Sequence, residues 1–432
     1  MNNAKLLFSA LLFFGFVVIS SFSVLESSPV SHRNSADTEL SGASVLAFGP
    51  DNVLFVGDSK AGIVHAISTK GDSLTDPVPY NFLDFDLKLA EALEMQPRDL
   101  VIQDMKVHPV SQEVYVSVKK GHQPDAKSVI AIANPMGMDI RLLDIAKAPN
   151  SQVSIKNTAS KELTFWRDIP AGILNITDID YYEGYIYVAG ISNGEFASTL
   201  RKIPYPFKGE QTVVGGIEIF HAIHTQKETR APIRTMVITE LEGVPTLIAS
   251  YTCTPLVTIP LSEIQDGKKI VGTTIAELGY GNTPIDMFSY MAQEQDGSMD
   301  QKLFVTHKHR SGSLISMKSV ATAAKGSGLD QTKPYAGTPE GIPITPMPTN
   351  TVIHMDNQNQ MMVAALKRNL ETGGLDLVSE IKGVFLRLSE FISEYDFPDY
   401  KYDEKQAFTK QFHDMIKPME GYPELTSDKT KK

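Results

Sequence analysis

Cysteine is almost absent from this sequence, because Cys253 is the only one among 432 residues. A single thiol cannot form an internal disulfide, so a disulfide-stapled fold is excluded and stability has to come from packing. The sequence also lacks Cys-x-x-Cys-His, Gly-x-Ser-x-Gly, His-Glu-x-x-His, a P-loop and a Rossmann glycine pattern. Covalent haem is therefore not expected, and no catalytic motif says whether the protein is an enzyme.

Positive charge is also scarce. The chain has 40 Lys and Arg residues against 51 Asp and Glu residues, a formal net charge of −11. Proteins that bind phosphate backbones or anionic membrane surfaces usually carry a basic patch, so we expect neither nucleic acid nor lipid headgroups as partners. An acidic surface could instead steer a redox partner protein.

Long apolar runs are confined to the start of the chain. Lys5 is followed by an uncharged stretch over residues 6–25. This pattern is typical of a signal peptide or an N-terminal anchor. Ser21 and Ser23 suit cleavage after residue 23, and serines interrupt the apolar run, so we favour a signal peptide over residues 1–23. The mature protein is then periplasmic or extracellular, with an N-terminal membrane anchor as the alternative.

Short β-type runs separated by turn residues dominate the remainder. Residues 45–68, VLAFGPDNVLFVGDSKAGIVHAIS, alternate three apolar runs with two turn sequences. Units of this kind start near residues 45, 103, 177, 234, 285 and 352, with no regular helical pattern between them. They predict an all-β protein with a single β-propeller over residues 41–391. A pair of β-sandwiches is the alternative fold.

The spacing of the units leaves two blade counts open. Residues 140–157 leave room for a degenerate further blade, so we favour seven blades, with six as the alternative. One helix is expected within residues 83–97, and residues 392–432 are expected to form an acidic, polar C-terminal tail. We expect the strand near residues 41–48 to pair with the last blade, since closure removes exposed sheet edges.

Several blocks of the sequence resemble a family of exported bacterial β-propeller proteins. They include LAFGPDNVLFVGDS, LVIQDMKVHPVSQEVYVSVKKG, SYTCTPLV and AELGYGNTPIDM. The resemblance covers roughly residues 41–388 and leaves out the tail. It implies the propeller fold and export, but it implies no reaction and no catalytic residue.

Three aspartates occur at equivalent places near blade starts: Asp104, Asp178 and Asp286. The innermost strand of each propeller blade lines the central channel, so these carboxylates could converge there. Converging oxygens would suit a divalent cation such as Ca²⁺, or the carboxyl groups could act as acid or base. We favour a structural role in which each Asp accepts hydrogen bonds from its own turn. Arg234 and His354 occupy the corresponding places in other blades, which excludes a symmetric ring.

A polar loop provides further candidates for ligand binding. His221 and His224 are three residues apart and could share a metal ion. Arg230 and Arg234 follow, and Arg310 lies in a later polar stretch; arginines of this kind can clamp a carboxylate or phosphate. For the histidines we favour a loop whose charges pair with one another over a metal site.

Cys253 follows an alternating run that places it with Leu247, Ala249 and Tyr251 on one apolar strand face. A buried free cysteine packs as a small hydrophobic residue, and no base lies next to it in the sequence. The sequence therefore predicts a structural role for Cys253. A copper site with His221 and His224 is the alternative.

These observations favour an exported propeller that acts as a binding or partner scaffold and takes a protein or small-molecule ligand at the channel mouth. One alternative is a metal-dependent, lactonase-like hydrolase, because FGPDNVLFVGD resembles the blade pattern of such enzymes. Its cation would be held by Asp104, Asp178 and Asp286. The other alternative is a docking subunit for a redox partner.

Overall fold

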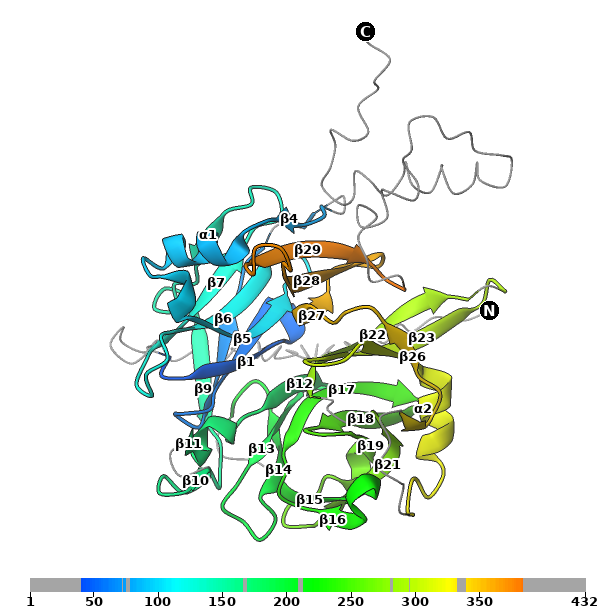
Figure 1. Cartoon of the computed structure of the whole chain (residues 1–432). Helices are drawn as coiled ribbons and strands as arrows, with labels where there is room; N and C mark the ends of the chain where they lie inside the picture. Colours follow the sequence, from blue (N-terminus) through cyan, green and yellow to red (C-terminus); the bar gives the residue numbers. More distant parts are fainter. Residues whose placement is uncertain are drawn as a thin grey trace, which may run out of the picture.

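The computed structural model describes residues 40–71, 73–74, 78–165, 169–208, 213–279, 283–294, 296–331 and 339–383. Within these residues, six sheets of four or more mostly antiparallel strands are arranged in a ring, so the protein is a β-propeller (Figure 1). The expected signal segment over residues 1–23 and tail over residues 392–432 lie outside the described residues. None of the helices in the described ranges is long and apolar enough to cross a bilayer.

The first three blades are named here by the order in which the chain enters them. Blade I consists of β1 (Ala43–Phe48), β2 (Val53–Asp58), β3 (Ile63–Ser68) and β9 (Asn150–Ser154). Blade II consists of β5 (Leu100–Val107), β6 (Val114–Lys120), β7 (Ser128–Ala133) and β8 (Ile140–Leu142). Blade III consists of β12 (Asp178–Tyr182), β13 (Tyr185–Ile191), β14 (Ser198–Pro204), β15 (Val213–His221) and β16 (Gln226–Glu228), and β20 (Ile270–Val271) pairs in parallel with β15.

The last three blades follow the chain in simple order. Blade IV consists of β17 (Ile233–Leu241), β18 (Val244–Tyr251), β19 (Pro255–Pro260), β21 (Thr273–Glu277) and β25 (Glu340–Gly341). Blade V consists of β22 (Pro284–Gln293), β23 (Met299–His307), β24 (Gly312–Ser316) and β26 (Thr345–Met347). Blade VI consists of β27 (Val352–Asn357), β28 (Met362–Arg368), β29 (Leu375–Ile381) and β4 (Asn81–Phe82). A separate hairpin joins β10 (Thr164–Phe165) to β11 (Ile169–Pro170).

Tight hairpins set the register inside the blades. In blade III, Glu183 (φ 42°) and Gly184 (φ 82°) form the two-residue turn between the paired residues Tyr182 and Tyr185. Two successive positive φ angles match the twist of the flanking strands and favour glycine at the second position. Blade IV repeats the same Glu-Gly turn between β17 and β18. Local turn chemistry therefore determines the inner hairpins of these two blades.

The structure has six blades, the smaller of the two predicted counts. Residues 140–157, which we expected to form a seventh blade, supply one strand to each of two existing sheets. Ile140–Leu142 is β8, the outer strand of blade II, and Asn150–Ser154 is β9, the outer strand of blade I. Each segment adds a fourth strand to the exposed edge of a three-stranded sheet. The hydrogen bonds that it forms there explain why the two segments join different blades and do not pair with each other.

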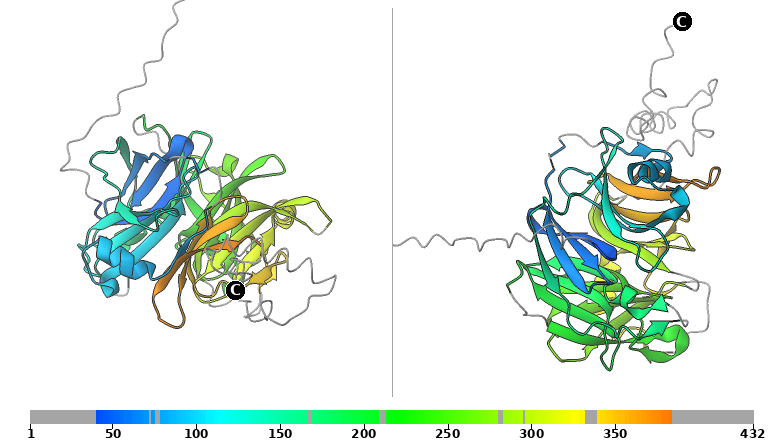
Figure 2. Two further views of the ribbon diagram at one scale, coloured as in Figure 1. Left: turned by 90° about the horizontal axis from the view of Figure 1, so that it is seen from above. Right: turned by 90° about the vertical axis from the view of Figure 1, so that its left-hand side faces the viewer.

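The ring closes differently from the expected arrangement. The strand at the start of the propeller, β1, does not pair with the last blade; it pairs with β2 in its own sheet and lies at the channel. Blade VI is completed by β4, in which Phe82 pairs with Leu377 of β29. The cyan strands of blade II lie between the blue strands of blade I and the orange strands of blade VI (Figures 1 and 2). The order around the ring is therefore I, III, IV, V, VI, II.

The hydrophobic core confirms this order, since its six larger clusters each lie between neighbouring blades. They occupy the interfaces I–II, I–III, III–IV, IV–V, V–VI and VI–II. At the VI–II interface, Leu377 of the last blade packs with Val116 of the second blade. Blade II therefore joins the two ends of the ring through side-chain packing.

Two helices cover outer parts of the propeller. The helix α1 (Phe85–Ala92) lies within the range predicted from the sequence and buries Phe85 and Leu89 against the VI–II cluster. The second helix, α2 (Met317–Ala324), was not predicted. It buries Val320 and Ala321 against the IV–V cluster. Its eight residues include Val and Thr, which have little helix propensity, and tertiary packing stabilises it instead.

Candidate functional site

The six inner strands present their first residues to the central channel. Five of them contain a register irregularity at this end: β1, β5, β17, β22 and β27. A bulge bends the strand and re-aims the side chains beside it. Asp104, Asp178, Asp286 and His354 all line the narrow part of the channel, and all of them except Asp178 lie beside one of these irregularities.

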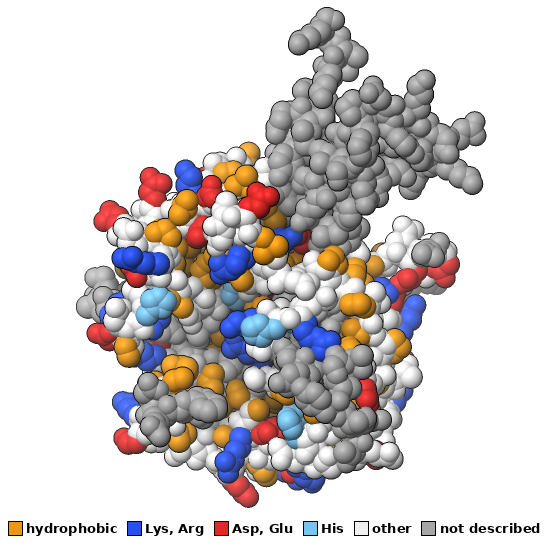
Figure 3. Space-filling model, in the orientation of Figure 1, with side chains coloured by type: hydrophobic (Ala, Val, Ile, Leu, Met, Phe, Trp, Pro, Cys, Tyr) orange, Lys and Arg blue, Asp and Glu red, His pale blue; other side chains and the backbone are white. Residues whose placement is uncertain are grey.

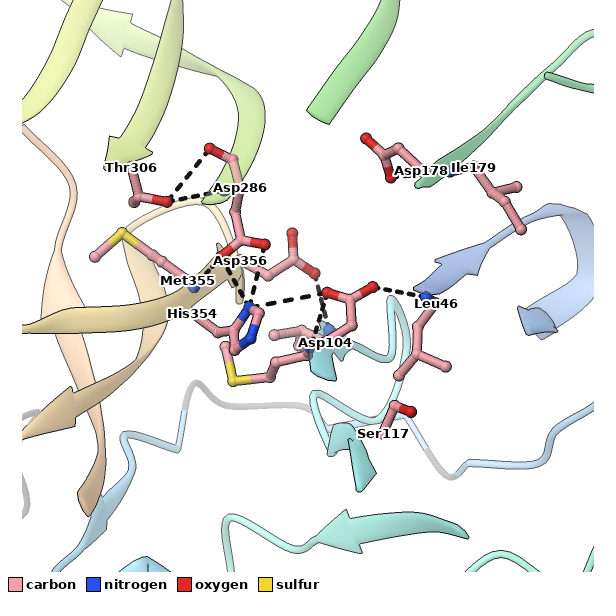
Figure 4. A network of polar contacts seen from close by, with 12 residues as sticks. Leu46, Asp104, Ser117, Asp178, Ile179, Asp286, Thr306, His354, Met355 and Asp356 are labelled. Carbon is pink, nitrogen blue, oxygen red and sulfur yellow. Dashed lines mark hydrogen bonds and ion pairs between the residues drawn. The ribbon is translucent and has the colours of Figure 1, made fainter. Parts of the chain in front are cut away.

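The three predicted aspartates connect neighbouring blades. Each accepts a backbone N–H from the next inner strand of the ring, and Figure 4 shows the bonds to Asp104 and Asp286. The bonds run from Leu46 to Asp104 Oδ2 (2.6 Å), from Met236 to Asp178 Oδ2 (2.6 Å) and from Met355 to Asp286 Oδ2 (2.9 Å). Asp356 of blade VI likewise accepts the Val107 N–H of blade II, at 2.8 Å from Oδ2. The geometry extends the expected turn-capping role, because one carboxylate also holds two blades together.

Two of these aspartates also approach a histidine. His354 Nδ1 lies 3.2 Å from Asp286 Oδ2 and 3.9 Å from Asp104 Oδ1. One ligand atom from each of the three residues lies within 4.8 Å of the others. Asp178 does not belong to this group. Sequence reasoning noted His354 as an exception to the aspartate pattern; its position at the start of an inner strand was the signal that could have added it to the candidates.

Lys106, which β5 directs into the same space, brings a positive charge to the channel carboxylates. Burial alone would lower the pKa of Lys106, but the nearby carboxylates of Asp356 and Asp104 hold it well above its usual range. Burial also opposes a charge on His354, yet Asp286 raises the pKa of that imidazole. Burial raises the pKa of Asp178 to about 7. Neighbouring carboxyl groups in this channel therefore titrate differently.

A cavity of about 870 Å³ opens over one end of the channel and shares Gln103, Arg234, Ile285 and His354 with it. Its basic lining residues are Arg98, Arg234, Lys308, Arg368, His122, His309 and His354. The space-filling view shows Lys, Arg and His side chains gathered around a hollow in the centre of this face (Figure 3). Asp86 is the one carboxylate among the described lining residues, and it accepts the Leu375 N–H at 3.0 Å.

The predicted arginines are separated in the structure. Arg234 lines both the cavity and the channel, whereas Arg230 and Arg310 are not among the described residues that line either. Arg230 lies on an exposed loop, where its N–H donates to Glu228 Oε1 at 2.6 Å. Sequence reasoning missed Arg98 and Arg368, because the segments that carry them are far from Arg234 in the chain.

The predicted strand position of Cys253 is wrong. The strand β18 ends at Tyr251, and Cys253 lies half-buried in the turn before β19, with φ 84°. Alternation could not be extended across this turn, because a residue in the left-handed region breaks the strand geometry. The turn brings Cys253 to His221 and His224, with ligand atoms of all three within 4.8 Å of one another.

The two histidines of this second cluster lie edge to face, with ring centroids 4.3 Å apart. His221 ends β15, and His224 ends the short 3₁₀ helix η5 (Ala222–His224). Burial, and secondarily the nearby His224, lowers the pKa of His221 to about 4, so its imidazole is neutral at pH 7. Burial raises the pKa of the Cys253 thiol.

Comparisons with known proteins place the chain in no family. The chain matches no family model and no curated protein. Among solved structures it is similar to Drosophila Semaphorin 1b, extracellular domains 1-2 (8% identity, TM-score 0.36, covering 81% of this chain and 85% of that one). It is also similar to the soluble aldose sugar dehydrogenase of Escherichia coli (12%, 0.29, 79% and 97%) and to a glucose dehydrogenase (9%, 0.31, 79% and 97%). Likenesses this weak assign no residue, substrate or partner.

Proposed function

We propose that the protein is a binding propeller that takes a small anionic ligand, a carboxylate or a phosphate, in the cavity at the channel mouth. The observation that carries this proposal is the basic lining of the cavity in a chain whose net charge is −11. Arginine recognises carboxylate and phosphate through paired hydrogen bonds. When basic side chains gather in one cleft of an acidic protein, the positive electrostatic potential is concentrated in that cleft and attracts anions.

The rest of the lining indicates what else the ligand should contain. Val101, Ile102, Ile353 and Leu370 provide apolar wall between the basic side chains. A volume of about 870 Å³ is within the usual range for small-molecule sites. We therefore infer an anionic head group on a partly apolar body. The head group is drawn to the side of the cavity formed by Arg234, which also borders the channel.

Substituting Arg234 tests this function. We expect inorganic phosphate, citrate or benzoate to raise the melting temperature of the wild-type protein, and Arg234→Ala to weaken that binding about 10- to 100-fold, since hydrogen bonds to a charged group contribute about 1.5–3 kcal/mol. Isothermal titration gives the affinities. Arg230→Ala is the matched control, because that arginine lies outside the cavity. A protein indifferent to all three anions, or equal losses in both variants, would contradict the proposal.

A cation-dependent hydrolase is the second candidate, and the cluster of Asp104, Asp286 and His354 favours it. Two carboxylates and an imidazole with ligand atoms within 4.8 Å can hold a divalent cation. Against it, one oxygen of each carboxylate already accepts a backbone N–H, and Lys106 already brings a positive charge into the channel. Anion binding needs no rearrangement of these bonds, so we place it first.

The two candidates differ in their response to chelators. We expect the anion affinity measured by titration to be the same with and without EDTA, because the proposed site uses arginine and histidine side chains rather than a metal ion. Lactone hydrolysis that needs a divalent cation, disappears with EDTA and is lost in Asp286→Asn would establish the hydrolase instead. Asp180→Asn is the control, because this carboxylate of blade III accepts the Ile238 N–H of blade IV at 2.6 Å and lies outside the three-residue cluster.

A further inference from the structure

The cluster around Cys253 lies where blades III and IV meet, apart from the residues that line the channel and its cavity. His221 comes from the end of β15, His224 from η5 and Cys253 from the turn between β18 and β19. The two histidines belong to consecutive elements of blade III, whereas Cys253 comes later in the chain, from blade IV, and packing of the two neighbouring blades brings them together. The convergence is therefore a product of the fold.

Glu277 adds an independent observation that points to a missing partner. Its side chain, at the end of β21, is 1% exposed. One carboxyl oxygen, Oε1, accepts the Ala222 N–H at 2.8 Å. The other, Oε2, has no hydrogen-bond partner within the described part of the chain, and it lies 3.9 Å from His221 Nε2. A buried carboxylate oxygen left without a partner costs free energy, and a bound cation would remove that cost.

We propose that His221, His224, Cys253 and Glu277 form a zinc site. Two imidazole nitrogens, one thiolate and one carboxylate oxygen are ligands that Zn²⁺ accepts in a tetrahedral arrangement. Tetrahedral zinc separates its nitrogen and sulfur ligands by about 3.3–3.6 Å, given metal–ligand bonds of about 2.0–2.3 Å. The ligand atoms of the first three residues already lie within 4.8 Å of one another. Glu277 lies outside that group of three, with Oε2 3.9 Å from His221 Nε2, so its side chain has to move toward the other two ligands to complete the site.

Zinc fits this set better than copper because the fourth ligand is a carboxylate oxygen. Copper sites with two histidines and one cysteine usually take a weak axial sulfur. On binding, the Cys253 thiol loses its proton to solvent and the sulfur forms the bond to the metal. His221 Nε2 now contacts the Thr254 hydroxyl at 3.0 Å, and the zinc ion replaces this contact. A site with four protein ligands is closed, so its role is to stabilise the junction between the two blades.

The single cysteine makes the site easy to test. The full chain is stripped with a chelator, dialysed and titrated with zinc chloride. We expect about one zinc ion per chain by elemental analysis and a rise in melting temperature. Because Cys253 is the only thiol, alkylation reports on this residue alone, and zinc should slow it at least about tenfold by holding the thiolate. Cobalt substitution should give a thiolate-to-cobalt charge-transfer band in the near ultraviolet together with the visible d–d bands of tetrahedral cobalt.

Variants decide whether these four residues hold the ion. Cys253→Ser and His224→Ala should each weaken zinc binding at least about 100-fold, more than the loss typical of residues that only support a ligand. His122→Ala, at the cavity, and Asp286→Asn, in the channel, should bind zinc like the wild type. Absence of stoichiometric zinc in the wild type overturns the proposal. So does unchanged affinity in the first two variants, and copper in place of zinc in protein isolated from its native source would replace it with the copper site.

Discussion

Replacing Arg201 with methionine is expected to lower the free energy of unfolding by about 4 kcal/mol. The Arg201 side chain is 0% exposed, and burial lowers its pKa to about 10. Its partners are four backbone carbonyl oxygens: Lys156 (2.9 Å), Asn175 (3.2 Å), Asn157 (3.2 Å) and Ile191 (2.9 Å). Methionine keeps the length of the side chain but removes every donor, so all four hydrogen bonds are lost, although Asn157 O keeps another donor, the Asn193 N–H at 3.3 Å.

The position of Arg201 explains why the effect should be large. Lys156 and Asn157 follow the outer strand of blade I, and Asn175 precedes the inner strand of blade III. The guanidinium therefore holds the connection between two blades to the middle of blade III. Lysine keeps the charge but lacks the planar array of donors. The free energy of unfolding of Arg201→Lys should therefore lie between those of the wild type and Arg201→Met.

Chemical denaturation measures the loss. The control is Arg141→Met, because Arg141 is 44% exposed and pairs with Glu113 at the surface. Exposed ion pairs contribute about 1 kcal/mol or less. If Arg201→Met and wild type unfold at the same denaturant concentration, the carbonyl cluster does not stabilise the junction.

The second large effect is a fall in stability as the pH rises from about 5 to 8. Burial raises the pKa of Asp178 from 3.8 to about 7 in the folded protein, with Asp104 adding to the rise and Lys106 opposing it. The folded state therefore binds more protons than the unfolded state between these values, and stability falls as the pH rises. The loss is about 1.4 kcal/mol for each pH unit up to the folded pKa of about 7, so it is about 3 kcal/mol in all above pH 5.

The other channel groups act in the same direction or outside the window. His354 has a pKa above its usual 6.5, against the effect of burial, because Asp286 is beside it. The stability it contributes is complete below pH 6.5 and is lost as the pH rises through the folded value. Asp286 has a lowered pKa because His354 outweighs burial, and its contribution is lost only below about pH 4.

Denaturant midpoints at pH 5, 6, 7 and 8 test this prediction. Asp178→Asn should reduce the slope with pH, because the amide does not titrate. It also places an NH₂ group near the N–H donors of Met236 and Ile179, a cost that is the same at every pH. The slope is therefore the readout. A variant with the wild-type slope, or stability that increases with pH, would show that Asp178 ionises normally in the channel.

Local sequence patterns determined the fold class. The alternation of apolar residues and the turn residues between them act over fewer than about ten positions, so each hairpin can be predicted from its own segment. The Glu-Gly turn at residues 183–184 and the helix beginning at Phe85 are of this kind. Six such units with no regular helical pattern between them were enough to indicate a propeller.

The same patterns could not determine how the ring closes. An outer strand is identified by the edge on which it forms hydrogen bonds, and that edge belongs to residues far away in the chain. Thus Asn81–Phe82 completes the last blade and Asn150–Ser154 completes the first, although nothing in the sequence of either segment indicates the strand with which it pairs. This is why a seventh blade was expected at residues 140–157 and why the closing strand was misplaced.

The candidate sites divide in the same way. Residue type and repeat position were sufficient to select Asp104, Asp286, His221 and His224 from the sequence. Their partners became visible only in three dimensions: His354 beside two aspartates, Arg98 and Arg368 in the same cavity as Arg234, and Glu277 beside His221. Local sequence specifies strands and turns through short-range geometry, whereas a site is assembled by packing between blades, and only the tertiary structure decides which side chains meet.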